Sequence, residues 1–212
     1  MSRDFPATPE AFPARQAEVI RLPVGLTDEA IVHGLRARDR ESAAQLFDRY
    51  AEHLRRVLVR VLGPDPEIPD LLQDVMVAAL GSIDRLDDPR ALRAWLTRIA
   101  VFTARVRIRR RTRWRFLRFV APEELPELGI DPHDAPASET LRATYRVLER
   151  LEPDDRIAFA LRFLHGMELS EVAHAAQVSL ATIKRRLNRA QQNFQQLARA
   201  EPSLGDWLGG LP

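Results

Sequence analysis

Apolar residues recur at helical spacing through most of the chain, and short polar or proline-rich breaks separate the segments. The stripe is clearest between residues 180 and 197. At about 100° per residue, one side of this segment collects apolar side chains, namely Ile183, Leu187, Ala190, Phe194 and Leu197. The pattern predicts an all-α protein with a well-defined helix near its C-terminal end.

A helix-turn-helix is predicted around this stripe. A short helix over 171–176 precedes the turn 177–179, and Ser179 suits the N-cap because its hydroxyl can accept from free N–H groups. The side opposite the core is cationic and amide-rich, with polar members at Ser179, Thr182, Lys184, Arg185, Arg186, Arg189 and Gln192. This arrangement is typical of a major-groove helix, whose flanking cations hold phosphates. A solvated basic face is the alternative.

The first hundred residues predict a helical hairpin followed by further helices. Thr27 opens a helix with acidic residues in its first turn, and Asp39 caps a longer one that Gly63 ends. The longer helix carries a core stripe of Ala43, Leu46, Phe47, Tyr50, Leu54, Val57, Leu58, Val61 and Leu62. Ile31, Val32 and Leu35 supply the core face of the shorter helix.

The third predicted helix has an unusual polar side. Pro69 fits only its first turn, and the inward stripe comprises Leu71, Leu72, Val75, Met76 and Ala79. Asp70, Gln73 and Asp74 lie together on the other side, with Val77 in their middle. An apolar residue surrounded by acidic side chains and an amide is typical of a small protein-docking patch. The alternative is a single exposed valine without a function, which is common on protein surfaces.

A polar loop over 82–88 precedes a strongly basic helix. Asp88 and Pro89 start this helix, and its predicted core stripe is Leu92, Trp95, Leu96, Ile99 and Val106, with Phe102 at the margin. On the far face Arg98, Arg105 and Arg109 line up, and more arginines interleaved with aromatic residues follow up to residue 119. The row predicts a salt-sensitive edge that faces nucleic acid, with a solvated helix end as the alternative.

The composition then changes to an acidic, proline-containing linker over 119–137. It divides the chain into two small helical domains, over 27–118 and 138–199, flanked by tails over 1–26 and 200–212. Ser138 is the predicted cap of the second domain, and Pro153 with Asp154 and Asp155 starts its second helix. This C-terminal domain should hold four helices, of which the helix-turn-helix is the last pair.

Composition bounds the chemistry of the 212 residues. Without cysteine there is neither a disulfide framework nor a thiolate metal site, and the five histidines lack metal-ligand spacing. No glycine motif cradles a phosphate, so we expect no metal, cofactor or small-molecule substrate, and an enzyme is the least favoured class. No signal peptide or membrane span is apparent, which favours the cytoplasm. The net charge of +2 is small, and Lys184 is the only lysine.

The order of these segments resembles the extracytoplasmic-function sigma factors, the smallest class of bacterial polymerase specificity subunits. The resemblance covers about residues 27–118 and 138–197. It rests on the stretches ESAAQLFDRYAEHLRRVLVRVLG, DLLQDVM, LRAWLTRIA, LERLEPDDRIAFALRFLHGMELSEVA and VSLATIKRRLNRA.

The resemblance implies a division of labour. The stretch DLLQDVM would give Asp70, Gln73, Asp74 and Val77 a partner in the clamp helices of the largest subunit of core RNA polymerase. The loop with Arg85 and the helix with Arg98, Arg105 and Arg109 would open the minus-ten element of promoter DNA and hold a flipped base of its nontemplate strand. The helix at 181 would read the minus-thirty-five element, and an anti-sigma factor is a further candidate partner. We expect the free protein to bind duplex DNA poorly.

Three residues depart from the family's pattern. Phe102 and Val106 stand where many relatives have asparagine and aspartate, and Arg185 stands where serine is frequent. These changes predict altered promoter preferences. Two alternatives stay open, namely a sigma-like protein that docks on polymerase without reading a promoter, and a helix-turn-helix regulator that works without polymerase.

Overall fold

The computed structural model describes residues 26–118 and 135–204, and all regular elements in these two ranges are helical. The predicted linker over 119–137 and the predicted tails over 1–26 and 200–212 lie largely outside these ranges. The all-α prediction with two helical regions is therefore confirmed.

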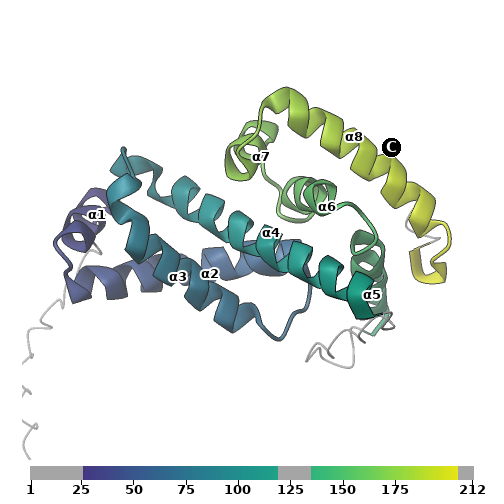
Figure 1. Ribbon diagram of the computed structural model, residues 1–212, viewed down its shortest axis with the longest axis horizontal. Coiled ribbons are helices and arrows are strands. Elements are labelled where there is room, and N and C mark those ends of the chain that lie inside the picture. The colour runs from purple at the N-terminus through teal and green to yellow at the C-terminus, as the bar shows by residue number, and fades with distance from the viewer. Residues whose placement is uncertain (1–25, 119–134, 205–212) are drawn as a thin grey trace, which may run out of the picture.

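Six helical elements form the first region. They are α1 (Asp28–Arg36), α2 (Arg40–Leu62), α3 (Ile68–Ser82), the 3₁₀ turns η1 (Ile83–Arg85) and η2 (Pro89–Ala91), and α4 (Leu92–Arg118). The predicted caps form, since Thr27 accepts a hydrogen bond from the N–H of Ala30, and Asp39 accepts from the N–H of Ser42 at 2.8 Å. Helices α2, α3 and α4 pack on one another, with α1 against α2 at one end (Figure 1).

The second region holds the predicted four-helix arrangement. Its elements are α5 (Ala135–Leu148), α6 (Pro153–Phe159) with a π-helical turn η4 (Ala160–Leu164), α7 (Leu169–Ala176), α8 (Leu180–Ala198) and the short turn η5 (Pro202–Leu204). Gln177 takes a left-handed conformation, with φ of 55°, in the turn between α7 and α8. Ser179 caps α8 by accepting from the N–H of Thr182 at 3.2 Å, as predicted.

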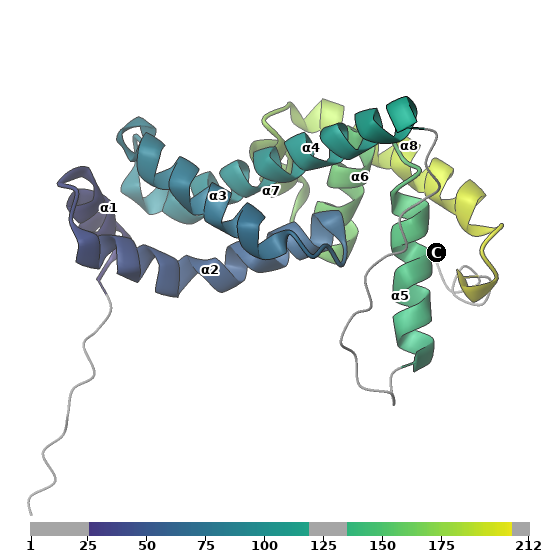
Figure 2. The ribbon, with the colours of Figure 1, turned by 60° about the horizontal axis from the view of Figure 1, so that its bottom comes forward.

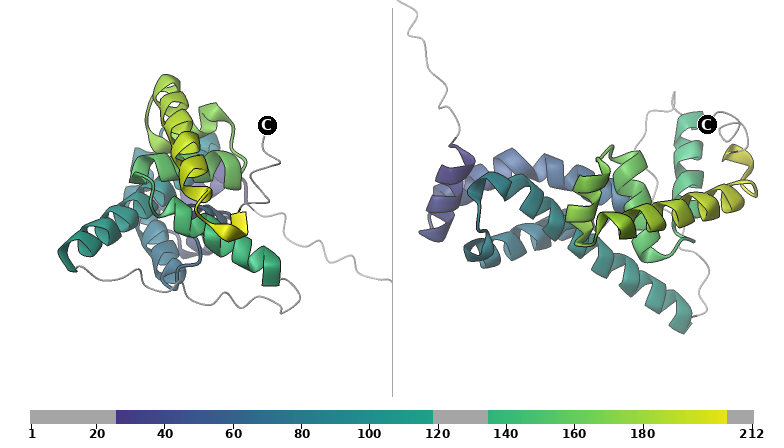
Figure 3. Two further views of the ribbon diagram at one scale, coloured as in Figure 1. Left: turned by 90° about the vertical axis from the view of Figure 1, so that its right-hand side faces the viewer. Right: turned by 90° about the horizontal axis from the view of Figure 1, so that it is seen from above.

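The two regions share one hydrophobic cluster, and a second cluster joins α5, α6 and α8 within the second region. Helices α6 and α7 pack on α4, and η4 packs on α2, while α8 lies on the far side of α6 (Figures 1 and 2). Buried apolar residues of the second region, such as Ile157, Val172 and Ile183, join the same cluster as Leu58 and Leu96 of the first. Seen from above, α8 and the C-terminal part of α4 run away from this junction toward the same end of the molecule and diverge from each other (Figure 3, right).

The second region also caps the C-terminal end of α2. The Tyr145 hydroxyl donates to the carbonyls of Val59 and Arg60, at 3.1 and 3.2 Å. The buried guanidinium of Arg156 donates to the carbonyls of Val61 and Leu62, at 3.1 and 2.8 Å. Three of these carbonyls, those of Arg60, Val61 and Leu62, lie in the last turn, where a helix leaves carbonyls without intrahelical partners, and the carbonyl of Val59 also accepts from the N–H of Gly63 at 2.8 Å. Both donor residues are more than eighty positions away in the sequence.

Four local predictions are wrong. Helix α5 begins at Ala135, so Ser138 lies inside the helix, because Pro136 is tolerated in a first turn. Phe47, placed in the core, is 50% exposed, because none of the elements in the described ranges covers that side of α2. The loop 82–88 is less polar than expected, since Ile83 and Leu86 are buried and anchor it. Val106 is not on the core stripe, as described below.

Candidate nucleic-acid interface

Part of the predicted DNA-reading side of α8 is open to solvent. Ser179, Lys184, Arg185 and Gln192 are exposed, and Thr182 is half-buried. Within the described ranges Lys184 and Arg185 make no ion pair. The core stripe beneath them, with Ile183, Leu187, Ala190 and Phe194, is buried as predicted. This leaves two cations and an amide on one face of a well-capped helix.

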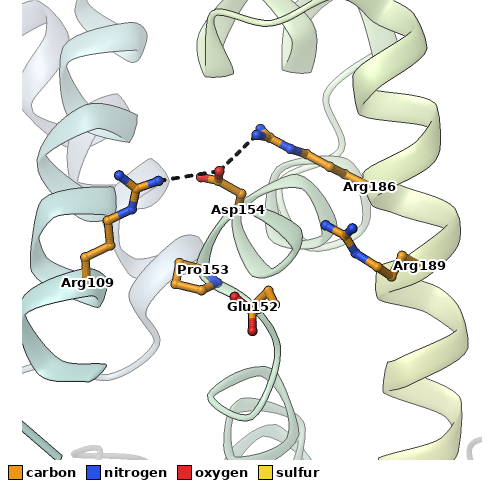
Figure 4. Close-up of a pocket in the computed structure, with 6 residues that line it drawn as sticks. All are labelled: Arg109, Glu152, Pro153, Asp154, Arg186 and Arg189. Carbon is orange, nitrogen blue, oxygen red and sulfur yellow. Dashed lines mark hydrogen bonds and ion pairs between the residues drawn. The ribbon is translucent and has the colours of Figure 1, made fainter. Parts of the chain in front are cut away.

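Two other predicted contacts of α8 turn toward α6 (Figure 4). Arg189 binds both carboxylate oxygens of the fully buried Asp155, at 2.5 and 2.7 Å. Arg186 donates to Asp154 Oδ2 at 2.9 Å. A buried carboxylate needs a charged partner, so Arg189 holds α8 against α6 whatever else it does.

The same Asp154 also receives arginines from the first region. Arg105 Nε lies 3.1 Å from its Oδ1, and Arg109 Nη2 lies 3.6 Å from its Oδ2. Arg105 also donates to the carbonyl of Ala176 at 3.2 Å, and burial lowers the pKa of this guanidinium despite the opposing effect of Asp154. Three arginines predicted to serve two separate DNA elements therefore meet on one carboxylate.

This junction borders an open hollow between α4, α6 and α8. Its lining is mainly charged and comprises Arg109, Glu152, Pro153, Asp154, Arg186 and Arg189. Figure 4 shows the guanidinium groups of Arg109 and Arg186 approaching Asp154 from opposite sides. We refer to Asp154 with Arg105, Arg109 and Arg186 as the interdomain clasp.

The remaining minus-ten candidates stay apart from the clasp. Arg85 is exposed in η1, and Arg98 is half-buried on α4 without an ion pair among the described residues. Arg107 and Arg111 instead bind Asp65, at 3.6 and 3.0 Å, and Arg107 binds Glu67 at 2.7 Å. Part of the arginine run thus fixes the α2–α3 connection.

Phe102 and Val106 are on the outer side of α4. Their exposed fractions are 57% and 50%, whereas Trp95, Ala100, Val101, Ala104 and Ile108 form the buried face of the helix. The assignment of Val106 to the core stripe, and of Phe102 to its margin, is therefore wrong. The elements that pack on α4 change along its length, so the stripe that starts at Leu92 does not continue straight.

The predicted docking patch on α3 is exposed as a unit. Asp70, Gln73 and Asp74 are exposed, and Val77 has an exposed fraction of 62%. Leu80, one turn after Met76, is also partly exposed at 38%. Leu71, Val75, Met76 and Ala79 face the core as expected, so the patch rests on a rigid helix.

Sequence reasoning missed the role of Asp154. The pattern placed it correctly in the first turn of a helix, where acids are common, but its partners lie 49 and 32 positions away. No local signal identifies a carboxylate that joins three helices. Within the described ranges, no group of histidine, aspartate and glutamate side chains is arranged to hold a metal ion, and none of the helices has the length and apolarity needed to cross a bilayer.

Two family models match the chain. The one described as Sigma-70 region 2 matches residues 46–114, and the one described as Sigma-70, region 4 matches residues 141–192. The extracytoplasmic-function (ECF) RNA polymerase sigma-E factor of Escherichia coli K12 is 30% identical over 176 residues, which cover 79% of this chain and 92% of the relative. The chain belongs to the ECF sigma factor family. It is therefore a sigma factor for transcription initiation.

Other comparisons agree with this family. The sigma-E factor of Haemophilus influenzae is 27% identical over 179 residues, covering 80% of this sigma factor and 94% of the relative. The structure of CnrH in complex with the cytosolic domain of CnrY superposes with a TM-score of 0.56 at 23% sequence identity. The match covers 82% of this chain and 98% of CnrH. The sigma factor RpoE of Bartonella quintana, solved with the anti-sigma factor NepR, superposes with a TM-score of 0.51 at 22% sequence identity. This match covers 74% of this chain and 97% of RpoE. These two structures support the fold.

Proposed function

We propose that this sigma factor docks on core RNA polymerase through the α3 patch and directs promoter-specific initiation by reading an upstream element with α8 and melting the minus-ten region with α4. It would act in the cytoplasm, where the polymerase works, and an anti-sigma factor is a further candidate partner. One observation carries the proposal, namely that a single chain of this family exposes both an acidic patch with Val77 at its centre and a cationic helix-turn-helix face.

The clasp supports the expectation that free protein binds duplex DNA poorly. Arg105, Arg109 and Arg186 are paired with Asp154, and a phosphate must displace this carboxylate before it gains the same arginines. The α3 patch has no such obstruction among the described residues. This difference favours an order of events in which polymerase binds first and the DNA-reading surfaces open afterwards.

Run-off transcription tests the proposal directly. Purified protein is added to core polymerase and a promoter library made from the genome that encodes it, and we expect discrete transcripts that depend on the protein. Tight binding to core without transcripts would favour the docking-only alternative. Sequence-specific DNA binding with no binding to core would favour the regulator without polymerase.

Two variants separate docking from DNA reading. Val77→Asp places a charge at the centre of the α3 patch, and its affinity for core should fall about tenfold or more if Val77 is a central contact. Arg185→Ala should bind core normally and transcribe weakly from promoters that need the upstream element. Ala200→Asp, at an exposed position after α8, is the control for added charge. Equal core affinity for Val77→Asp and Ala200→Asp would contradict the docking assignment.

A further inference from the structure

A pair of histidines lies across the interface between the two regions. His165, directly after η4, faces His53 of α2 with the ring centroids 5.9 Å apart in an edge-to-face arrangement. His53 is buried and lies 2.9 Å from the hydroxyl of Thr97 on α4, whereas His165 is half-buried. Because η4 packs on α2, this pair is a second polar contact between the regions, separate from the clasp.

The charges that act on His165 are divided unequally between the two regions. The cations all belong to the first region, with Arg56 and Arg60 on α2 and Arg93 on α4. Burial lowers the pKa of His165 and these three arginines lower it further, whereas Glu171 of α7 has the opposite effect. Separation of the regions would therefore take His165 away from three cations and leave it beside its glutamate.

Other charged groups near η4 have partners of their own. Arg162, on η4 itself, lies 3.5 Å from Glu168, and Arg156 of α6 donates to the carbonyls at the end of α2. Arg56 lies 3.7 Å from Glu52, but these side chains are 61% and 58% exposed, so solvent screens the pair. The arginines of the first region therefore keep an unfavourable environment for a proton on His165.

We propose that His165 makes the closed arrangement sensitive to acid, and that its protonation favours separation of the two regions. In the closed molecule the added charge lies against the cations of the first region, whereas in the open molecule it is hydrated and keeps Glu171. The open form therefore binds the proton more tightly, and by linkage a fall in pH raises the open population. The inference goes beyond the proposed function and does not depend on it, because it concerns the free protein.

Single-molecule fluorescence energy transfer on the full chain tests this. The chain has no cysteine, so Gly81→Cys on α3 and Gln191→Cys on α8 introduce two unique labelling sites at exposed positions. The range from about pH 7.5 to about pH 5.5 lies above the ordinary pKa of carboxylates and spans that of histidine, 6.5. Each pH unit below 6.5 should increase the population with low transfer efficiency by up to about tenfold.

Three variants, each made in the labelled chain, assign the response. His165→Gln keeps a polar side chain but does not titrate, so its open population should change much less with pH than that of wild type. His174→Gln, at an exposed position of the same region, is the matched control and should respond as wild type does. Arg60→Gln removes a cation that opposes the proton in the closed form, so the response should become weaker.

Far-UV circular dichroism in the same buffers distinguishes opening from unfolding, and the helical signal should stay constant over this pH range. An open population that does not grow in acid, or that grows equally in His165→Gln and in wild type, would overturn the inference. Loss of the helical signal in parallel with the low-efficiency population would also overturn it, because acid would then unfold the chain. None of these readouts uses polymerase or promoter DNA, so their failure is distinct from a failure of the proposed function.

Discussion

At the scale of single residues, His53 is held neutral between cationic neighbours. Its Nε2 lies 2.9 Å from the hydroxyl of Thr97, which donates to the carbonyl of Arg93 and must therefore accept from His53. Its Nδ1 faces Arg93 Nη2 at 3.5 Å, and the ring of His165 lies 5.9 Å away across the interface between the regions. Burial, followed by Arg93, His165 and Arg56, lowers the pKa of His53 to about 4.

This arrangement predicts a loss of stability in mild acid. The ordinary pKa of histidine is 6.5. Between pH 6.5 and about 4, His53 is therefore protonated in the unfolded chain and neutral in the folded protein. The free energy of unfolding should be highest above this window and should fall as the pH drops through it. The pKa of His165 is also lowered, mainly by burial and then by Arg60, Arg56 and Arg93, although Glu171 opposes this, and it adds to the trend.

Urea unfolding at several pH values between about 7 and about 5 measures this slope. His53→Gln keeps a donor for Thr97 but does not titrate, so its free energy of unfolding should depend less on pH than that of wild type. His174→Gln, at an exposed position on α7, is the control. The assignment would be contradicted if His53→Gln and wild type showed the same slope.

At the scale of elements, the end of α2 depends on close contact with α5. Gly63 has φ of 79°, and a Cβ at this position would lie 2.7 Å from Cδ1 of Tyr145. The backbone conformation and the contact therefore both require glycine. The tyrosine that packs here also donates to the α2 carbonyls, so one side chain links both features.

Gly63→Ala should lower the free energy of unfolding by about 2 kcal/mol or more, through backbone strain and the clash with Tyr145. Gly81→Ala is the matched control, because Gly81 lies in α3 and no atom within 4 Å would meet its Cβ. That change should stabilise the protein by up to about 1 kcal/mol, since alanine favours helix. Denaturant unfolding of both variants gives the comparison, and equal effects would rule out a special role for Gly63.

Sequence patterns predicted where the helices begin better than they predicted which neighbouring elements cover each helix. The caps at Thr27, Asp39 and Ser179 are local interactions, so the residues themselves define where helices begin. Trp95 and Phe102 are seven positions apart on the same side of α4, yet Trp95 is buried and Phe102 is exposed. Which neighbour covers a given turn is a tertiary property, and helical periodicity does not encode it.

The candidate site also has features that sequence periodicity predicts and features that it does not. The exposure of the α3 patch and of Arg185 follows from periodicity, because both lie opposite a clear apolar stripe. The pairing of Arg186 and Arg105 with Asp154 does not, because it depends on how two separately patterned regions dock. Identical arginines in one helical row therefore have different surroundings.

At the scale of the whole molecule, the two regions are closed against each other through a shared core and the clasp. Arg105 and Arg186 have side chains that are only 18% exposed, so their charges depend on Asp154. Removing this carboxylate leaves three guanidinium groups together without a counter-charge, which favours separation of the regions.

Asp154→Asn should therefore loosen the closed arrangement. Each of the three partly exposed ion pairs contributes about 0.5–1 kcal/mol, so the affinity of free protein for a duplex that carries the upstream element should increase by about tenfold to a hundredfold. Fluorescence anisotropy measures this affinity, and small-angle X-ray scattering should show a larger radius of gyration. Glu152→Gln, in the same hollow, is the control. If Asp154→Asn bound DNA no better than Glu152→Gln, the clasp would not restrain DNA binding.

Asp154 gives the closed molecule one further property. The same carboxylate neutralises arginines of the two proposed DNA-reading surfaces, so a phosphate that captured Arg105 or Arg109 would weaken the hold on Arg186, and the reverse is equally true. Thermodynamic reciprocity requires that each promoter element raise the affinity for the other by one common factor. The free energy that separates the two regions is then required only once, whichever element binds first, and binding of the second element does not require it again. If these surfaces read the two elements as proposed, DNA with a single element should gain little affinity, and DNA that carries both should be strongly favoured.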